Sequence, residues 1–391
     1  MDLRLFFDIQ ENDYEVEKNR FLKHMDFLRS LSNEELTLYK KWSEVQSYSK
    51  MLDKSSVLKA NIWRPTNILD RTSTIQEIQN LEPEILFIRP ADKSLVEDWS
   101  ILRVFISTME FDQNPGRFIR FLVRDKVTKK YLGITSLGSD VVAITCRDKW
   151  IGWDTETRIK KGMIRHSAIA TTVVPTQPLG YNMLGGKLIA SLLCTDVVRN
   201  AWKELYDEVL VGVTTTSLYG KHSMYQRIPY WKELGETTGR VTLKPADSYY
   251  KFWHHWIQEH YPEKYAEKTL GAGNGPATGV KQKILVMIMK ELGMKQSTYI
   301  HGFSRGVYYA PFFENTKEFL CKKISESELV PSKKLEGGYD AIVGWWKDKA
   351  IRRYENLFDQ NRINPETLFY NRAIGMSWDE MKKNYAEEVG R

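Results

Sequence analysis

Residues 130–243 alternate strand-like and helix-like segments, with glycine and polar residues where the segments meet. A β-branched run from Thr171 stops at Pro175 and is followed by a glycine-bearing turn and a long segment with apolar periodicity that ends at Leu193. The next strand-like run is EVLVGVTTTSLYG, and it leads into HSMYQRIPYWKELGETTGRV. This order predicts an α/β core, in which a strand-to-helix turn typically holds the phosphate of a bound donor.

Length and charge set wider limits on the function. The chain has 391 residues, enough for a main domain with smaller attachments. Its formal charge of +7 is a mild basic excess that suits a polyanionic partner such as DNA. The three cysteines lie far apart without CxxC spacing, which argues against a disulfide framework or a thiolate zinc site and favours the reducing cytoplasm. No apolar run approaches about 18 residues, so we expect no membrane span.

Four regions are expected along the chain. Residues 1–95 have mainly helical spacings, and residues 96–265 carry the α/β core. A glycine-rich linker follows at 266–280, and the remaining region, 281–391, is expected to be mainly helical. Within the core, two β-rich runs flank the charged turn Arg124–Lys130 and predict a hairpin.

The hairpin followed by strand, helix, strand and helix resembles the core of the GCN5-related N-acetyltransferases. The resemblance implies a mixed sheet flanked by helices, with two splayed central strands that pair with the pantetheine of an acyl-CoA-type donor. The N-terminus of the next helix would receive the donor's pyrophosphate. Gln177, Gly180 and Asn182 stand where that family has its Q/R-x-x-G-x-G/A loop, and Lys187 follows on the same segment. The alternative is a strand-to-helix turn that binds nothing.

Three sequence segments also resemble the uncharacterised DUF4338 family, namely RDKWIGWD, PLGYNMLGGKLIASLL and MYQRIPYWKELGETTGRV. That family includes a component of the Druantia anti-phage defence system, and similar proteins occur in phages. The chain departs from the family pattern in two places. Thr214–Thr216 stand where the family tends to have E-T-F, and Ile228–Tyr230 replace its A-x-N triplet.

The last of these segments is also distantly similar to the Mom-type DNA-modifying proteins of phages, which share the acetyltransferase-like core. This resemblance implies a transferase of phage origin that adds a small acyl-type group to a DNA base in the host cytoplasm and protects the DNA from host nucleases. Two alternatives stay open. One is a non-enzymatic DNA-binding or phage-defence-related protein that retains the fold, and the other is an acetyltransferase for a protein or a small amine.

Four residues are candidates for the chemistry. In the acetyltransferase core, a tyrosine early in the helix after the second central strand protonates the departing thiolate, and Tyr225 occupies that place. His222 lies three residues before it and shares its face if the helix covers both. Ser217 at the strand end can hold a substrate amine or phosphate, and Asp154 is a nearby carboxylate for proton abstraction. Each also has a structural alternative, as a packed ring, a helix cap or a turn residue.

Aromatic and basic residues form a second cluster that suits nucleic acid. Indoles stack on unpaired bases while lysine and arginine neutralise phosphates, so the mixture fits a base drawn out of the duplex. Two tryptophans three residues apart also fit a buried core. The segment KFWHHWIQEH lacks the HExxH order, so we predict an amphipathic helix there and no metal site. The predicted nucleic-acid contacts are Arg147, Trp150, Trp153, Lys221, Arg227 and Arg240.

Overall fold

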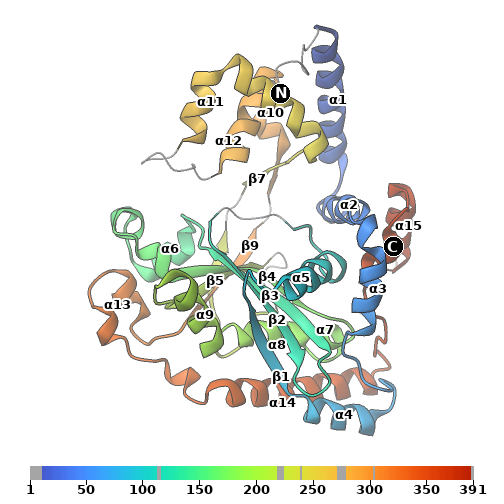
Figure 1. The fold of residues 1–391 in the computed structure, drawn as a ribbon, viewed down its shortest axis with the longest axis vertical. Helices are drawn as coiled ribbons and strands as arrows, with labels where there is room; N and C mark the ends of the chain where they lie inside the picture. Colours follow the sequence, from blue (N-terminus) through green and yellow to red (C-terminus); the bar gives the residue numbers. More distant parts are fainter. Residues whose placement is uncertain are drawn as a thin grey trace. The chain divides into compact units, whose positions relative to one another are not determined.

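The computed structural model describes residues 11–111, 116–217, 224–237, 240–270, 279–302 and 304–388. These residues form two compact units, whose elements are labelled in Figure 1. The smaller unit takes its described residues from 1–38 and 238–303, and the larger unit takes its described residues from 39–237 and 304–391. The four regions expected from the sequence stay a prediction, because most of the glycine-rich linker lies outside the described residues.

A seven-stranded mixed sheet forms the centre of the larger unit, in the order β1-β2-β3-β4-β5-β9-β6. All neighbouring strands are antiparallel except β4 and β5, which are parallel. This sheet and its helices confirm the predicted mixed α/β class. The strands are β1 (Pro83–Ile88), β2 (Phe118–Asp125), β3 (Tyr131–Ser139), β4 (Ser167–Pro175), β5 (Gly212–Ser217), β6 (Lys232–Thr237) and β9 (Arg305–Pro311).

The predicted hairpin is confirmed as β2 and β3. Its turn is organised by the buried carboxylate of Asp125, which accepts hydrogen bonds from the backbone N–H of Thr128 at 2.8 Å and of Glu82 at 2.9 Å. Lys129 completes the turn with a φ of 60°, in the left-handed region. A shift of register at Val123 interrupts the β2–β3 pairing.

Side chains that alternate along the strands divide the core into two layers. Phe121 and Val123 of β2 pack on the face covered by α8 (Gly185–Leu192), α9 (Asp196–Tyr206) and α14 (Gly338–Asp359). Leu122 points to the opposite face, which α5 (Lys93–Ile106) and α3 (Leu52–Ala60) cover (Figure 1). The remaining α-helices with residues in this unit are α2 (Asn33–Gln46), α4 (Arg71–Asn80), α6 (Thr145–Ile151), α7 (Leu179–Asn182), α13 (Thr316–Leu320) and α15 (Trp378–Glu388).

The smaller unit packs helices around aromatic side chains. Trp253 of α10 is fully buried and contacts the ring of Phe21 edge-on, with ring centroids 6.3 Å apart. The segment KFWHHWIQEH lies in α10, which buries Tyr250, Trp253, Trp256 and Ile257, so the predicted amphipathic helix is confirmed. The elements are α1 (Glu11–Ser30), α10 (Asp247–His260), α11 (Pro262–Thr269), α12 (Val280–Glu291) and the antiparallel strands β7 (Arg240–Thr242) and β8 (Ile300–Gly302).

The segment between β5 and β6 differs from the expectation. The sequence predicts a helix that carries Tyr225, whereas residues 224–230 form turns and residues 218–223 lie outside the described part of the chain. Arg227 has a φ of 60°, and Pro229 lacks a backbone N–H, so a continuous helix cannot pass through this segment.

Candidate functional site

The parallel strands β4 and β5 separate after a short paired segment. Ser167–Ile169 of β4 pair with Gly212–Thr214 of β5, and the register ends there. One residue further along β5, the hydroxyl of Thr215 donates to the carbonyl oxygen of Ala170, 3.4 Å away. Among the described strands, the edge of β4 that faces β5 therefore has no backbone partner strand from Ala170 onward.

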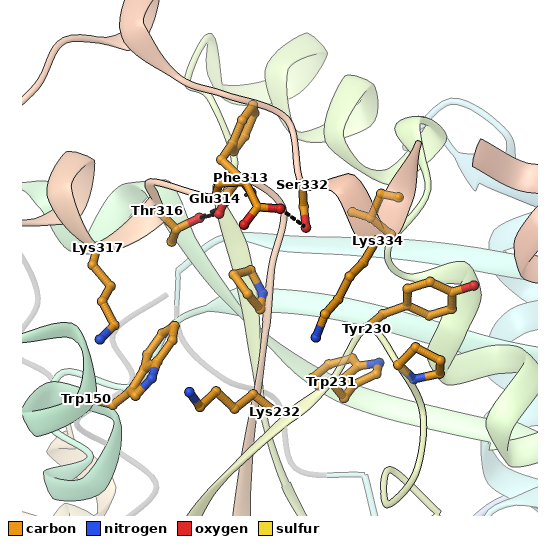
Figure 2. Close-up of a pocket in the computed structure, with 13 residues that line it drawn as sticks. Trp150, Tyr230, Trp231, Lys232, Phe313, Glu314, Thr316, Lys317, Ser332 and Lys334 are labelled. Atoms are coloured by element: carbon orange, nitrogen blue, oxygen red, sulfur yellow. Dashed lines mark hydrogen bonds between the residues drawn. The ribbon is translucent and has the colours of Figure 1, made fainter. Parts of the chain in front are cut away.

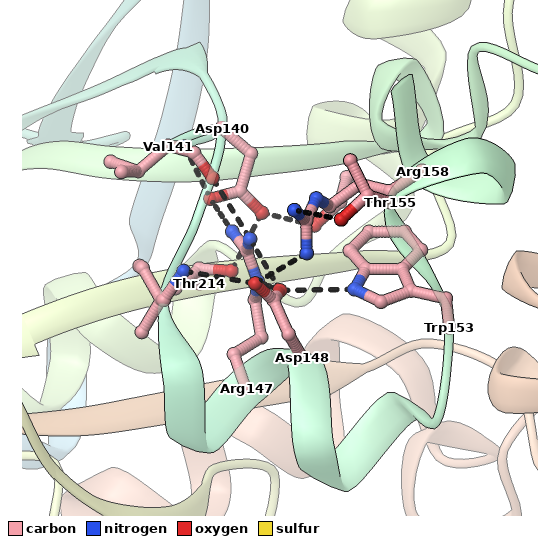
Figure 3. Close-up of polar contacts among 10 residues, drawn as sticks. Asp140, Val141, Arg147, Asp148, Trp153, Thr155, Arg158 and Thr214 are labelled. Carbon is pink, nitrogen blue, oxygen red and sulfur yellow. Dashed lines mark hydrogen bonds and ion pairs between the residues drawn. The ribbon is translucent and has the colours of Figure 1, made fainter. Parts of the chain in front are cut away.

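Asp140 holds the paired ends of the two strands together (Figure 3). Its carboxylate accepts hydrogen bonds from the hydroxyls of Ser167 in β4 at 2.6 Å and Thr214 in β5 at 2.8 Å. The same carboxylate forms an ion pair with Arg147 at 2.6 Å. Burial raises the pKa of the Asp140 carboxyl, and the Arg147 guanidinium opposes this rise. The buried carboxylate thus sets the point from which the strands diverge.

Arg147 and Trp153 belong to this buried network. Arg147 is fully buried, and its guanidinium also donates to Asp148 at 2.7 Å and to the carbonyl oxygen of Val141 at 2.8 Å. Trp153 is 6% exposed and donates its indole N–H to Asp148 at 2.9 Å. Contrary to the prediction, neither side chain presents a surface to nucleic acid, because both are engaged inside the core.

The loop that follows β4 is closed by its own hydrogen bonds. The backbone N–H of Gly180 donates to the carbonyl oxygen of Thr176 at 2.8 Å, and that of Tyr181 donates to the Gln177 side-chain oxygen at 3.0 Å. A Cβ on Gly180 would lie 2.6 Å from the Gln177 amide nitrogen and 2.9 Å from Pro175 Cγ, so a larger residue would displace the Gln177 side chain. The N–H groups of Gly180 and Tyr181, which the sequence assigns to a donor phosphate, already have acceptors.

Asn182 and Lys187 also bind within the chain. The buried Asn182 amide donates to the carbonyl oxygen of Asn364 at 2.6 Å and accepts from the Asn364 backbone N–H at 2.9 Å. The Lys187 ammonium donates to the carbonyl oxygens of Met224, 2.9 Å away, and Gln226. Burial lowers the pKa of Lys187 to about 8. These two predicted cofactor ligands therefore fasten neighbouring segments of the larger unit.

Tyr225 lies where β4 and β5 separate. Its ring is 4% exposed and packs against Trp231 and Tyr308, with ring centroids 5.0 and 5.3 Å away. Its hydroxyl and that of Thr215 lie within hydrogen-bond distance, 3.2 Å apart. Burial raises the pKa of the Tyr225 phenol, so the group is protonated at neutral pH.

The other predicted catalytic residues each have their own surroundings. Ser217 is the last residue of β5, is buried, and lies opposite Gly306 of β9. Asp154 is exposed and accepts a hydrogen bond from the backbone N–H of Thr157 at 2.6 Å, which lowers the pKa of the carboxyl. That contact caps the short π-helix Glu156–Lys160, so Asp154 has a local structural role. His222 lies outside the described residues.

The predicted basic residues Arg227 and Arg240 belong to different units. Arg227 is exposed in the turn after Tyr225. Arg240 begins β7 of the smaller unit, where its backbone pairs with Gly302. Lys221 lies outside the described residues. The three therefore do not define one described surface.

Trp150 lies in a pocket of about 210 Å³ that sequence reasoning did not identify (Figure 2). The pocket brings together α6, the start of β6, and the segments that follow β9 and precede α14. Trp150 and Trp231 are distant in sequence from Lys317 and Lys334. The adjacent residues Trp231 and Lys232 are therefore the part of the pocket that a local sequence pattern could indicate. The lining residues are Trp150, Pro229, Tyr230, Trp231, Lys232, Pro311, Phe313, Glu314, Thr316, Lys317, Ser332, Lys334 and Leu335.

The described residues contain no group of three or more His, Cys, Asp or Glu side chains placed to hold a metal ion. Within the described part of the chain, no helix combines the length and the apolar character needed to cross a membrane.

Fold and site together define a mixed α/β protein with a parallel strand pair that opens beside a buried tyrosine. The chain belongs to the family described as Druantia protein DruA, whose model matches residues 38–322. The Druantia protein DruA of Escherichia coli (strain UMEA 4076-1) is 28% identical over 259 residues. This match covers 61% of the present chain and 62% of that protein, less than two thirds of its length. No solved structure matches the chain significantly.

Proposed function

We propose that the chain acts in phage defence, with a core that transfers a small group to DNA at the opening between β4 and β5. Its family bears the name of the Druantia anti-phage system, and the matched relative is bacterial. The bacterial relative favours action against phage over protection of phage DNA, the role that similarity to Mom-type proteins implies. Cytoplasmic action on DNA is part of this proposal.

The position of the Tyr225 hydroxyl carries the proposal. It is one hydrogen bond from Thr215, whose hydroxyl bridges to Ala170 of β4 just beyond the last paired residues. A pair of parallel strands that separate in the middle of the sheet is what similarity to the acetyltransferases implies. A phenol retains its proton at neutral pH, as a general acid must. Burial raises the pKa of the Tyr225 phenol further and makes it a weaker acid, so its position and not its pKa supports the role.

An acyl-CoA-type donor fits one part of this site and not the other. Among the described strands, the edge of β4 that faces β5 has no backbone partner strand beyond Ala170, and an extended edge of this kind can pair with the amides of a pantetheine arm. The loop does not fit the pyrophosphate, because the N–H groups of Gly180, Tyr181 and Asn182 are bonded inside the chain. We therefore derive no step through the donor, whose acyl class remains part of the proposal.

Nucleoside mass spectrometry tests the transfer. DNA from cells that express the chain is compared with DNA from cells that express Tyr225→Phe, which removes the hydroxyl but keeps the ring. Tyr354→Phe is the matched control, because Tyr354 is a fully buried tyrosine whose hydroxyl donates to the carbonyl oxygen of Ile68 at 2.9 Å. We expect a new nucleoside with the parent chain and the control, and none with Tyr225→Phe.

Equal yields from both variants would remove Tyr225 from the chemistry. Unmodified DNA in every sample would reject the transfer itself. The remaining candidate would then be a DNA-binding defence protein that retains the fold without chemistry. The closed loop favours that second candidate, and its signature is DNA affinity that falls steeply with salt concentration.

A further inference from the structure

The pocket around Trp150 is rich in positive charge. Figure 2 shows the ammonium groups of Lys232, Lys317 and Lys334 directed toward the same space. Among the residues that the structure describes, none of the three has a carboxylate within ion-pair distance. Glu314 also lines the pocket, but one of its oxygens accepts hydrogen bonds from the Ser332 hydroxyl at 3.2 Å and the Lys333 backbone N–H at 2.8 Å. The pocket thus has a net positive charge that suits an anion such as phosphate.

An indole lies beside these charges. Trp150 is half-buried, and its ring centroid is 4.8 Å from the Lys317 ammonium and 5.4 Å from the Lys232 ammonium. Its indole N–H is buried and has no acceptor among the described residues. Tyr230 and Trp231 supply further aromatic surface to the pocket. A hollow lined by aromatic rings and lysines matches a ligand with a flat ring system and a phosphate.

We propose that this pocket binds one unpaired nucleotide of a single-stranded nucleic acid, with its base against Trp150 and its phosphate among the three lysines. In a duplex, each base is stacked between its neighbours and hides both faces from a protein. A single strand exposes these faces, and stacking on an aromatic side chain tolerates any base. This proposal concerns binding alone and does not require group transfer, although Trp231 of the pocket also packs against Tyr225.

Binding of a nucleotide would replace the cation–π contact of Trp150 by base stacking and by pairing of a lysine with phosphate. In the free protein, lysine ammonium groups lie over the Trp150 ring. Stacking of a base on an aromatic side chain is stronger than a solvent-exposed cation–π contact. The displaced ammonium can move on its flexible side chain to the phosphate, so the pocket gains base stacking and phosphate pairing together.

Fluorescence anisotropy with labelled 20-nucleotide probes tests the pocket on the full chain. Probes of single-stranded DNA, single-stranded RNA and duplex DNA of one sequence are each titrated at several salt concentrations. The variants are Lys334→Ala and Trp150→Phe, and the control is Lys333→Ala. Lys333 is exposed and carries the same charge next to Lys334, but it does not line the pocket. The two lysine changes are made at exposed side chains, and Trp150→Phe keeps an aromatic ring beside the buried Tyr309.

We expect single strands to bind at least about tenfold more tightly than the duplex, and the DNA and RNA probes to show which sugar is preferred. Lys334→Ala should weaken single-strand binding several-fold and reduce the slope of log affinity against log salt by about 0.7, whereas Lys333→Ala should change the slope less. Trp150→Phe should weaken binding about threefold through its smaller ring. Equal effects of the two lysine variants, or tighter binding of the duplex, would overturn the proposal. Strand binding is measured by anisotropy and group transfer by nucleoside mass spectrometry, so the failure of one proposal is distinguishable from the failure of the other.

Discussion

The Lys187 ammonium donates a hydrogen bond to the carbonyl oxygen of Met224, 2.9 Å away, and so fastens α8 to the turn that carries Tyr225. The ammonium lies in a half-buried site and donates to two backbone carbonyl oxygens. Burial lowers the pKa of Lys187 to about 8. A buried cation held by carbonyl dipoles is a means of positioning a turn.

Lys187→Met should therefore loosen the Tyr225 turn without unfolding the larger unit. The lost hydrogen bonds and the relieved cost of burying the charge offset each other, so we expect the free energy of unfolding to change by less than about 2 kcal/mol. Hydrogen exchange measured by mass spectrometry should show faster exchange in residues 224–231. Lys347→Met is the control, because the Lys347 ammonium donates to the carbonyl oxygen of Gln79 at 2.7 Å on another part of the unit. Equal exchange in the two variants would contradict the tether.

Arg147→Ala should destabilise the larger unit strongly. The change leaves the buried Asp140 carboxylate without its ion-pair partner, and breaking a buried pair in this way costs about 3–5 kcal/mol. Arg147→Lys should restore only part of this, because an ammonium cannot reach Asp140, Asp148 and Val141 together. Urea unfolding provides the measurement. Arg71→Ala, which removes two surface ion pairs with Glu355 and Asp359, should cost less than about 1 kcal/mol for each pair. A similar cost for Arg147→Ala would refute the role assigned to the network.

Asn182→Ala should free the C-terminal segment around Asn364. The variant removes two side-chain contacts to the Asn364 backbone, 2.6 and 2.9 Å long, and leaves buried polar groups unpaired at a cost of about 1–3 kcal/mol. Limited proteolysis should then cut within residues 360–377 faster than in the parent chain. Gln360→Ala serves as the comparison, since Gln360 is an exposed amide in the same segment. No difference in cleavage between the two variants would argue against this fastening.

The smaller unit should lose stability as the pH falls from about 6.5 to about 4. His24 is 5% exposed, stacks on Tyr249 with ring centroids 3.8 Å apart, and accepts the Ala246 backbone N–H at 3.2 Å through Nε2. Burial lowers the pKa of His24 from 6.5 to about 4. Between these values the unfolded chain binds the proton and the folded unit does not, so acid favours unfolding.

The expected loss for His24 is roughly 3 kcal/mol at pH 4, since each pKa unit corresponds to about 1.4 kcal/mol. Hydrogen exchange of α10 at pH 7 and pH 4.5, corrected for the intrinsic rate, follows it. His24→Gln keeps an acceptor but cannot titrate in this range, so its protection should depend less on pH. The same pH dependence in both proteins would exclude His24 as the source.

Local patterns carried most of the correct predictions. The hairpin β2–β3 follows from two β-rich runs around a charged turn, and the amphipathic α10 follows from aromatic spacing. The position of β9 between β5 and β6 depends on pairing with residues about 70 to 100 positions away, which no local pattern encodes. The sequence likewise could not show that Asp140 would draw Arg147 into the core.

The candidate site shows the same division. The resemblance to the acetyltransferases implies that Tyr225 follows the second central strand, and Tyr225 does lie beside Thr215 of β5, although in a turn instead of a helix. The loop is predicted to bind a donor. In the structure, the side chains of Gln177 and Asn182 instead form hydrogen bonds with nearby backbone groups. Lys317 and Lys334 come from region 281–391, which is predicted to be mainly helical. No sequence pattern places these lysines beside Trp150, so the pocket can be identified only in the folded structure.

The pairing of β6 also constrains how the protein is made. Among the described strands, β6 has one neighbour, β9, and the two are separated by the residues of the smaller unit. A ribosome that has released β6 must therefore synthesise that whole insertion before a partner strand emerges. During this interval the edge of β5 is also uncovered, so the newly made chain presents two open strand edges at once. Slow translation through residues 238–303 would lengthen this exposure. Prior folding of the inserted residues would bring the ends of β6 and β9 together and shorten the time that β9 needs to find its partner strands.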